Sequence, residues 1–176
     1  MNRIFLVGPM GSGKTTVGRH LATRLGLEFV DLDQEIQARC GVEVAVIFDI
    51  EGEAGFRRRE SDLLDELTRR EGIILATGGG SVISPDNRRM LRERGLVIYL
   101  RTSVDQQLRR LERDKQRPLL QTPDRRTRLE KMAEVRNPVY EDCADLVIAS
   151  SSISPKAMAE RVERAIDEHF DREQVS

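Results

Sequence analysis

The sequence has few of the features from which secreted, membrane-spanning or nucleic-acid-binding proteins are built. No apolar run approaches the roughly 20 residues that cross a bilayer, and no apolar signal segment stands near the N-terminus. The two cysteines, Cys40 and Cys143, form no CxxC pair and no Cys/His cluster, which predicts reduced thiols in a cytoplasmic protein. There is no tryptophan and aromatic residues make up 4%, so the chain has no stacking surface for single-stranded nucleic acid. We therefore expect neither a membrane nor a nucleic-acid partner.

An excess of charge of one sign is also lacking, because the net charge is −1 over 176 residues. Hydrophobic residues make up 39% and charged residues 34%, which is typical of a globular protein, and the length suits a single domain over residues 1–176. With no apolar stripe left over, we expect a monomer. One segment is locally basic, since residues 109–131 hold nine Lys or Arg against four Asp or Glu. It predicts either a solvated helix face or a site for a small anion.

Short apolar runs alternate with longer helical patterns along the chain. The predicted strands are 3–7, 28–31, 73–77, 96–100 and 145–148, and the predicted helices are 14–25, 33–39, 55–70, 85–94, 104–114, 127–140 and 155–170. This alternation predicts an α/β fold, a three-layer sandwich in which helices cover both faces of a five-stranded parallel sheet. Ligands of such sheets bind outside the carboxyl ends of the strands.

The strongest motif lies between the first predicted strand and the first predicted helix. "GPMGSGKT", residues 8–15, fits the phosphate-binding pattern G-x-x-x-x-G-K-[ST] in full. Its glycines let successive backbone N–H groups point at phosphate oxygens, and the helix that starts at Lys14 adds its positive dipole end. Lys14 supplies a charge for the β- and γ-phosphates, and Thr15 offers a hydroxyl to Mg²⁺. The motif predicts that a nucleotide binds here.

Two other nucleotide patterns fail in this sequence. The dinucleotide fingerprint G-x-G-x-x-G needs a third glycine where Thr16 stands. "DIEG", residues 49–52, matches the D-x-x-G of GTPases, but it follows no predicted strand and no N-K-x-D guanine motif occurs. We interpret this four-residue match as coincidence.

Two carboxylates follow the second predicted strand in "FVDLDQEI". Asp31 ends the strand and Asp33 lies two residues further on. One carboxylate beside a phosphate-binding loop can hold Mg²⁺ through water, and the other can accept the proton of an attacking hydroxyl. The alternative for Asp33 is the N-cap of the following helix.

Arginines and glycines mark two further segments. In "GFRRRESD" the side chains of Arg57, Arg58 and Arg59 point about 100° apart on a helix, so at most two can face one pocket. Glu60 is close enough to fix Arg57, and a solvated face is expected for Arg58 and Arg59. The triplet Gly78–Gly80 follows the third predicted strand, where it lets a ligand approach backbone N–H groups. A tight turn is the alternative for this triplet.

Two more arginines complete the candidate set. Arg117 lies in the least regular stretch, residues 112–124, whose prolines and charges predict a mobile lid. An arginine on such a lid can reach the γ-phosphate as charge develops. Arg136, in "VRNPVY", can complete a bidentate clamp on a carboxylate opposite Arg57.

Taken in order, these motifs resemble one family, the shikimate kinases. The resemblance extends to about residue 165 and rests on "GPMGSGKTT", "DLDQEI", "GFRRRE", "TGGGSV", "RPLL" and "RNPVY". It implies a sheet in the order 2-3-1-4-5, as in nucleoside monophosphate kinases. It also implies ATP-dependent phosphorylation of the 3-hydroxyl of shikimate to shikimate 3-phosphate, a step of chorismate and aromatic amino-acid biosynthesis.

The resemblance further implies roles for single residues. ATP is expected at Gly11, Ser12, Gly13, Lys14, Thr15, Thr16, Arg110 and Arg117, with Arg110 stacked on the adenine and an adenine loop near residues 151–155. Shikimate is expected at Asp33, Arg57, Gly79, Gly80 and Arg136, with a shikimate-binding region over about residues 33–60. The expected catalytic residues are Lys14, Asp33 and Arg117. The cofactor Mg²⁺ is expected at Thr15 and, through water, at Asp31.

Two alternatives fit parts of the pattern. A related small-molecule kinase, such as gluconate kinase, would share the phosphate-binding loop but would not require Arg57, Gly78–Gly80 and Arg136 together. A nucleotide-dependent switch or binding module would hydrolyse its nucleotide slowly and release no ADP in response to an acceptor.

Overall fold

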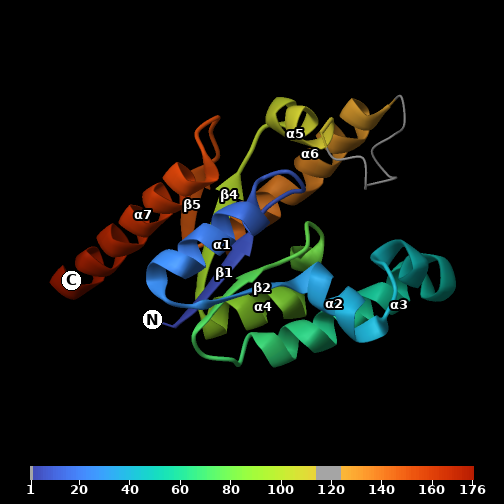
Figure 1. Cartoon of the computed structure of the whole chain (residues 1–176), viewed down its shortest axis with the longest axis horizontal. Coiled ribbons are helices and arrows are strands. Elements are labelled where there is room, and N and C mark those ends of the chain that lie inside the picture. Colours follow the sequence, from blue (N-terminus) through green and yellow to red (C-terminus); the bar gives the residue numbers. More distant parts are fainter. Residues whose placement is uncertain (1, 114–123) are drawn as a thin grey trace.

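A five-stranded parallel sheet forms the centre of the structure, a computed structural model that describes residues 2–113 and 124–176 (Figure 1). The strands are β1 (Arg3–Val7), β2 (Glu28–Asp31), β3 (Ile73–Ala76), β4 (Leu96–Arg101) and β5 (Leu146–Ala149). They lie in the order β2-β3-β1-β4-β5, and all four pairings are parallel. The predicted sheet and its strand order are confirmed.

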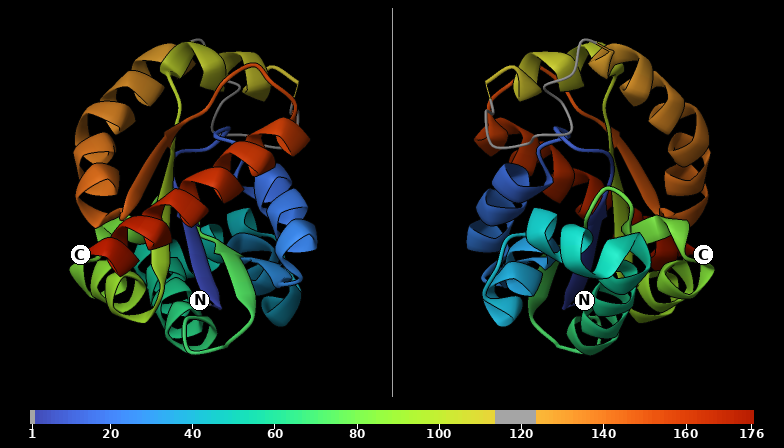
Figure 2. Two further views of the ribbon diagram at one scale, coloured as in Figure 1. Left: turned by 90° about the vertical axis from the view of Figure 1, so that its left-hand side faces the viewer. Right: turned by 90° about the vertical axis from the view of Figure 1, so that its right-hand side faces the viewer.

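Helices cover both faces of this sheet (Figure 2). They are α1 (Lys14–Leu25), α2 (Leu32–Cys40), α3 (Val44–Leu67), α4 (Pro85–Arg94), α5 (Val104–Leu111), α6 (Arg125–Cys143) and α7 (Pro155–Val175), and a 3₁₀ turn, η1 (Ser81–Ile83), lies between β3 and α4. One face packs against α1 and α7, whereas α3, α4 and α6 cover the other. Within the described ranges, no helix combines the length and the apolar character that crossing a membrane requires.

The central strands are apolar along their length because both faces of the sheet are covered. Successive side chains point to opposite faces, so the strands feed two separate cores. Phe5 and Val7 pack with α3, α4 and α6, while Ile4 and Leu6 pack with α1 and α7. The sheet is thus fixed from both sides, which gives the loops at its edge a rigid base.

The predicted starts of the helices at residues 85 and 155 are confirmed, and each is capped in the same way. The Ser84 side chain accepts a hydrogen bond from a backbone N–H at the start of α4, and Pro85 occupies the first turn. Ser154 and Pro155 repeat this arrangement at the start of α7. A hydroxyl cap followed by proline satisfies one N–H group and removes another, which is why both helices begin where the sequence predicts.

The prediction was wrong for the helix expected at residues 55–70. That helix, α3, runs from Val44 to Leu67 and passes through Gly52, whose φ of 70° and ψ of 179° interrupt it with a kink. Glycine adopts this backbone without a steric penalty. The kink interrupts the helical period between the two parts, so a periodicity argument misses the first part, although Phe48 packs against Phe56 across the kink. The other predicted ends differ from the observed ones by at most five residues.

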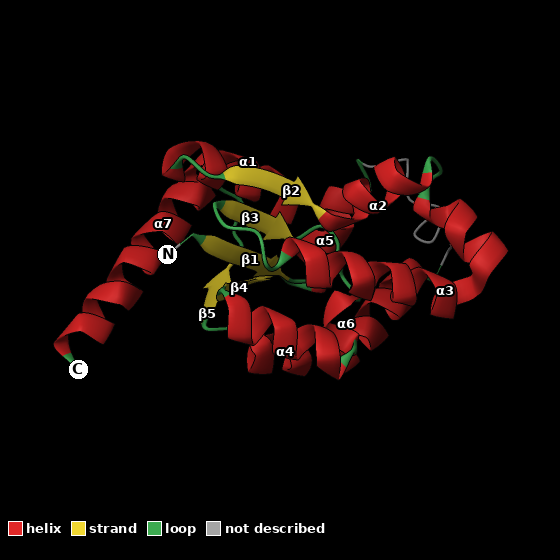
Figure 3. Ribbon diagram, turned by 90° about the horizontal axis from the view of Figure 1, so that it is seen from below, coloured by secondary structure: helices red, strands yellow, loops and turns green. Residues whose placement is uncertain are grey.

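The carboxyl ends of β1, β2 and β3 point to one end of the molecule, where α2 and α3 also lie (Figure 3). The phosphate-binding loop, residues 8–15, follows β1, and α2 follows β2. The triplet Gly78–Gly80 follows β3 through Thr77 and leads into η1. The predicted motifs therefore meet at one edge of the sheet.

Candidate active site

The phosphate-binding loop connects β1 to α1. Its glycines have φ values that side-chain-bearing residues rarely adopt: 147° at Gly8, 75° at Gly11 and 89° at Gly13. Because α1 begins at Lys14, its first N–H groups and the positive end of its dipole face the loop. The Lys14 ammonium folds back over the loop and donates to the carbonyl oxygens of Gly8 at 2.6 Å and Pro9 at 2.9 Å. The loop is thus shaped to receive an anion.

A hydroxyl and a carboxylate lie side by side next to this loop. The Thr15 hydroxyl donates to Asp31 Oδ2 at 2.7 Å, while Asp31 Oδ1 accepts from the Gln34 N–H at 3.0 Å. Asp31 is therefore the N-cap of α2, and the alternative that Asp33 caps this helix was wrong. The two oxygens are hard ligands close to the loop, and Mg²⁺ in nucleotide sites takes one or two such ligands besides water and phosphate. The residues present fit the predicted Mg²⁺ position.

Each glycine of the triplet Gly78–Gly80 lies next to one of the side chains predicted to bind the acceptor. A Cβ built on Gly78 would lie 3.0 Å from Asp33 Oδ1, and one on Gly80 would lie 2.8 Å from Arg57 Nη1. Arg136 lies at the middle glycine, since its Nη1 would be 3.6 Å from a Cβ on Gly79. A side chain at Gly80 would therefore fit only if the Arg57 guanidinium, which lies against the backbone there, moved aside.

A buried chain of hydrogen bonds joins Arg57 to this turn. Glu60, 1% exposed, accepts from Arg57 Nη1 at 2.9 Å and from the Ser81 hydroxyl at 2.9 Å. The Ser81 oxygen in turn accepts from the Gly78 N–H at 2.9 Å. Charge-assisted bonds of this kind are stronger than neutral ones, so Glu60 fixes both the arginine and the turn. The predicted contact between Glu60 and Arg57 is confirmed.

Arg110 connects the phosphate-binding loop to the segment after β5. Its guanidinium donates to the Gly11 carbonyl at 2.6 Å, to the Ser150 hydroxyl at 2.9 Å and to the Ser151 carbonyl at 3.3 Å. Burial lowers the pKa of Arg110 from its ordinary value. The Ser150 hydroxyl also reaches the carbonyl of the buried Ser12 at 3.4 Å. Arg110 thus lies between the loop and the segment where the adenine is expected.

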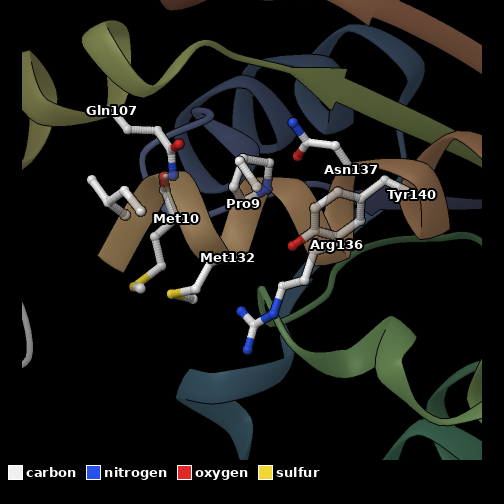
Figure 4. Close-up of a pocket in the computed structure, with 9 residues that line it drawn as sticks. Pro9, Met10, Gln107, Met132, Arg136, Asn137 and Tyr140 are labelled. Atoms are coloured by element: carbon white, nitrogen blue, oxygen red, sulfur yellow. Dashed lines mark hydrogen bonds between the residues drawn. The ribbon is translucent and has the colours of Figure 1, made fainter. Parts of the chain in front are cut away.

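A small cavity lies between the phosphate-binding loop and α6, beside the site (Figure 4). It is lined by Pro9 and Met10 of the loop and by Met132 and Arg136 of α6. Figure 4 shows the side chains of Met10, Met132 and Arg136 on the same side of this cavity. The volume of the cavity is about 10 Å³. That volume suits one water molecule and no larger ligand. The cavity is therefore too small to hold either expected substrate.

The structure brings most of the predicted site residues to one edge of the sheet. They are Gly11, Ser12, Gly13, Lys14, Thr15, Thr16 and Arg110 on the loop side, and Asp31, Asp33, Arg57, Gly79, Gly80 and Arg136 around the glycine turn. Arg117 and most of the predicted lid, residues 112–124, lie outside the described residues. Arg58 and Arg59 are exposed, as expected for a solvated face, and Arg59 pairs with Glu51 at 2.6 Å.

Two residues of this edge were missed by the sequence reasoning. The Ser81 hydroxyl links Glu60 to the Gly78 N–H by hydrogen bonds. The hydroxyl of the buried Tyr140 donates a hydrogen bond to the Gly79 carbonyl. Tyr140 stands four residues after Arg136, so both project from the same face of α6. That spacing in "RNPVY" is the signal that could have found it.

The fold and the site together define a class. A strand–loop–helix shaped for phosphate, facing a carboxylate, two arginines and a glycine turn, belongs to a P-loop kinase that acts on a small molecule. The family model described as shikimate kinase matches residues 10–167. The chain therefore belongs to the shikimate kinase family, whose phosphoryl donor is ATP.

Individual relatives support this assignment. A shikimate kinase of Vibrio cholerae is 52% identical over 167 residues, which cover 95% of this chain and 96% of the relative. One of Bordetella avium is 61% identical over 150 residues, covering 85% of this chain and 72% of the relative. The solved structure of shikimate kinase from Acinetobacter baumannii in complex with shikimate is similar with a TM-score of 0.92 at 45% identity, covering 96% of this chain and 94% of that one. A structure of shikimate kinase from Aquifex aeolicus reaches a TM-score of 0.81 at 28% identity.

Proposed function

We propose that this chain transfers the γ-phosphoryl group of ATP to the 3-hydroxyl of shikimate, giving ADP and shikimate 3-phosphate. The observation that carries the proposal is the convergence of Asp33, Arg57 and Arg136 on one glycine turn beside the phosphate-binding loop. A carboxylate next to two guanidinium groups suits an acceptor that carries both a hydroxyl and a carboxylate.

The two arginines hold the carboxylate of the acceptor. Guanidinium groups bind carboxylates in a planar, bidentate manner, and Arg57 is already fixed by Glu60 for this task. Within residues 2–113 and 124–176, neither the Gly79 N–H nor the Gly80 N–H finds an acceptor. Such N–H groups are normally paired in folded proteins, so a ligand oxygen is the partner that we assign to them.

ATP, the phosphoryl donor, binds along the phosphate-binding loop and the start of α1. Lys14 follows the β- and γ-phosphates, and Arg110 stacks on the adenine. Thr15 and, through water, Asp31 would hold Mg²⁺, which supplies charge neutralisation and orientation at the phosphates when bound. Ser12, Gly13 and Thr16 complete the contacts to ATP.

Phosphoryl transfer depends on positioning and on neutralising charge, more than on covalent help from the protein. Asp33 orients the acceptor hydroxyl and is the carboxylate placed to take its proton. Lys14 stabilises the charge that develops on the transferred group. We assign Arg117 the same task from a lid over residues 112–124 that closes on the substrates and excludes water.

The wider setting belongs to the same proposal. We infer a single domain over residues 1–176, with residues about 33–60 as its shikimate-binding region. We also infer a monomer that acts in the cytoplasm, with ATP and shikimate as its partners and with neither a nucleic-acid nor a membrane partner.

One assay tests the proposed reaction. ADP release is measured by a coupled assay with ATP and Mg²⁺, first alone, then with shikimate, then with gluconate. We expect release that depends on shikimate and that gluconate does not stimulate. Release with gluconate would favour the related kinase, and slow release that ignores both acceptors would favour a nucleotide-dependent switch.

A further inference from the structure

Tyr140 is buried on α6 in a position that no catalytic step of the proposed reaction uses. Its side chain is 0% exposed, and its hydroxyl donates to the carbonyl oxygen of Gly79. Figure 4 shows Tyr140 and Arg136 on one helix, with the Tyr140 oxygen directed toward the Arg136 side chain. A hydrogen bond from a helix to the middle glycine of the turn links two parts of the acceptor site.

The surroundings of Tyr140 keep its hydroxyl protonated, which is the form that can donate a hydrogen bond. Burial raises the pKa of Tyr140 to about 12, against the opposing effect of the nearby Arg136 and Arg57 guanidinium groups. Its ring packs against Tyr99, with ring centres 5.1 Å apart and planes tilted by 33°. The hydroxyl therefore stays protonated at neutral pH, and its position is set by packing.

Fixing one carbonyl also fixes the N–H on the other side of the same peptide. In a trans peptide the C=O of Gly79 and the N–H of Gly80 point in opposite directions. Holding the carbonyl on Tyr140 thus turns the Gly80 N–H away from α6. Without that hold, the triplet has the backbone freedom of glycine and can rotate.

We propose that Tyr140 is a positioning residue for the acceptor: its hydrogen bond to Gly79 orients the Gly79–Gly80 peptide so that the turn and Arg136 bind shikimate together. The inference rests on the proposed function. It predicts an effect on acceptor binding that is separable from ATP binding and from the stability of the fold.

The chain offers a matched control in Tyr99. Its hydroxyl is also buried, but it has no hydrogen-bond partner in the described part of the chain. Tyr140→Phe and Tyr99→Phe therefore remove the same atom from the same packed ring pair, and only the first breaks a hydrogen bond to the turn.

The test measures KM for shikimate, KM for ATP, kcat and Tm for the wild-type enzyme and both variants. We expect Tyr140→Phe to raise KM for shikimate about 2- to 10-fold, the equivalent of one neutral hydrogen bond. KM for ATP should change by less than about 2-fold. Tyr99→Phe should leave both KM values unchanged.

Three results would overturn the inference: an unchanged KM for shikimate in Tyr140→Phe, an equal rise in both KM values, or an equal rise in Tyr99→Phe. A lower Tm without a change in KM would assign Tyr140 to the core alone. Failure of the proposed function looks different, because the wild-type enzyme would then show no ADP release that depends on shikimate.

Discussion

The two halves of the proposed site, one for ATP and one for the acceptor, are built in opposite ways. The donor half is a single stretch, residues 8–15, in which three glycines and the start of α1 aim backbone N–H groups at one point. The acceptor half joins Asp33, Arg57, Gly78–Gly80 and Arg136 from α2, α3, the turn after β3 and α6. A local motif shows the first half in the sequence, whereas the second exists only after the sheet has assembled.

The halves also differ in what holds them. The shape of the donor half depends mainly on the backbone conformation of the loop, which Arg110 supports through the Gly11 carbonyl. The acceptor half depends on side chains, the chain from Arg57 through Glu60 to Ser81 and the Tyr140 hydroxyl. Substitutions should therefore affect the two substrates separately.

The largest expected effect is on the donor half, from Lys14→Met. Removing a cation that stabilises developing charge typically lowers kcat about 100- to 1,000-fold. Steady-state kinetics at saturating shikimate measure this loss, and Lys131→Met, at an exposed position of α6, is the control that should retain activity. A kcat within about 3-fold of wild type would remove Lys14 from the transferred phosphoryl group.

The next effect separates the two arginines of the acceptor half. Losing a charge-assisted contact to the substrate should raise KM for shikimate about 10- to 100-fold in both Arg57→Ala and Arg136→Ala. Only Arg57→Ala removes the cation that pairs with the buried carboxylate of Glu60. This variant should therefore also lower the free energy of unfolding, by about 1–3 kcal/mol.

Urea unfolding measures the second difference. Arg136→Ala should unfold close to the wild-type midpoint, because Arg136 neutralises no buried carboxylate in the described ranges. Equal destabilisation by the two variants would contradict the role given to Glu60, and a normal KM in either variant would remove that arginine from the clamp.

A smaller effect comes from the turn, through the pair Gly80→Ala and Gly79→Ala. Gly80 has φ −100° and ψ 2°, which alanine can adopt, but the new Cβ would overlap the end of the Arg57 side chain. The flexible side chain can move, so we expect an unchanged Tm and a rise of about 3- to 10-fold in KM for shikimate. At Gly79 the new Cβ would make only ordinary contacts of 3.6 Å, so its KM should rise less. The opposite ranking would show that the clash with Arg57 does not control binding.

The same contrast explains how much the sequence could predict. Alternating patterns predicted the parallel sheet and the positions of α1 and α4, because these depend on neighbours in sequence. The strand order was expected only from the resemblance to a family. The donor half was predictable from its local motif. The start of α3 was not, since the kink at Gly52 depends on how the two parts of that helix pack.

The acceptor half needed a resemblance to a family, because no spacing places Arg136 beside Gly79. Ser81 and Tyr140 escaped prediction since their partners, Glu60 and Gly79, lie far along the chain. Contacts of this kind follow from the packing of α3 and α6 over one face of the sheet. They are properties of the assembled fold.

The last effect is on stability and appears only at alkaline pH. It concerns the core behind the acceptor half, where Tyr140 and Cys143 are buried together. Burial raises the pKa of the Cys143 thiol from 9.0 to about 11, and that of Tyr140 from 10.0 to about 12. The unfolded chain then releases protons at a lower pH than the folded chain. The stabilising effect is complete below about pH 9 and is lost as pH rises to 11 and above.

We therefore expect the free energy of unfolding to fall by about 1–3 kcal/mol between pH 8 and pH 11. Urea unfolding at several pH values measures the slope, and Cys143→Ala should flatten its first part, between about pH 9 and 10. Cys40→Ala, at a partly exposed thiol, is the matched control and should keep the wild-type slope. An identical slope in the two variants would mean that the loss arises outside this core, and a flat profile in the wild-type protein would mean that burial of these groups does not limit its alkaline stability.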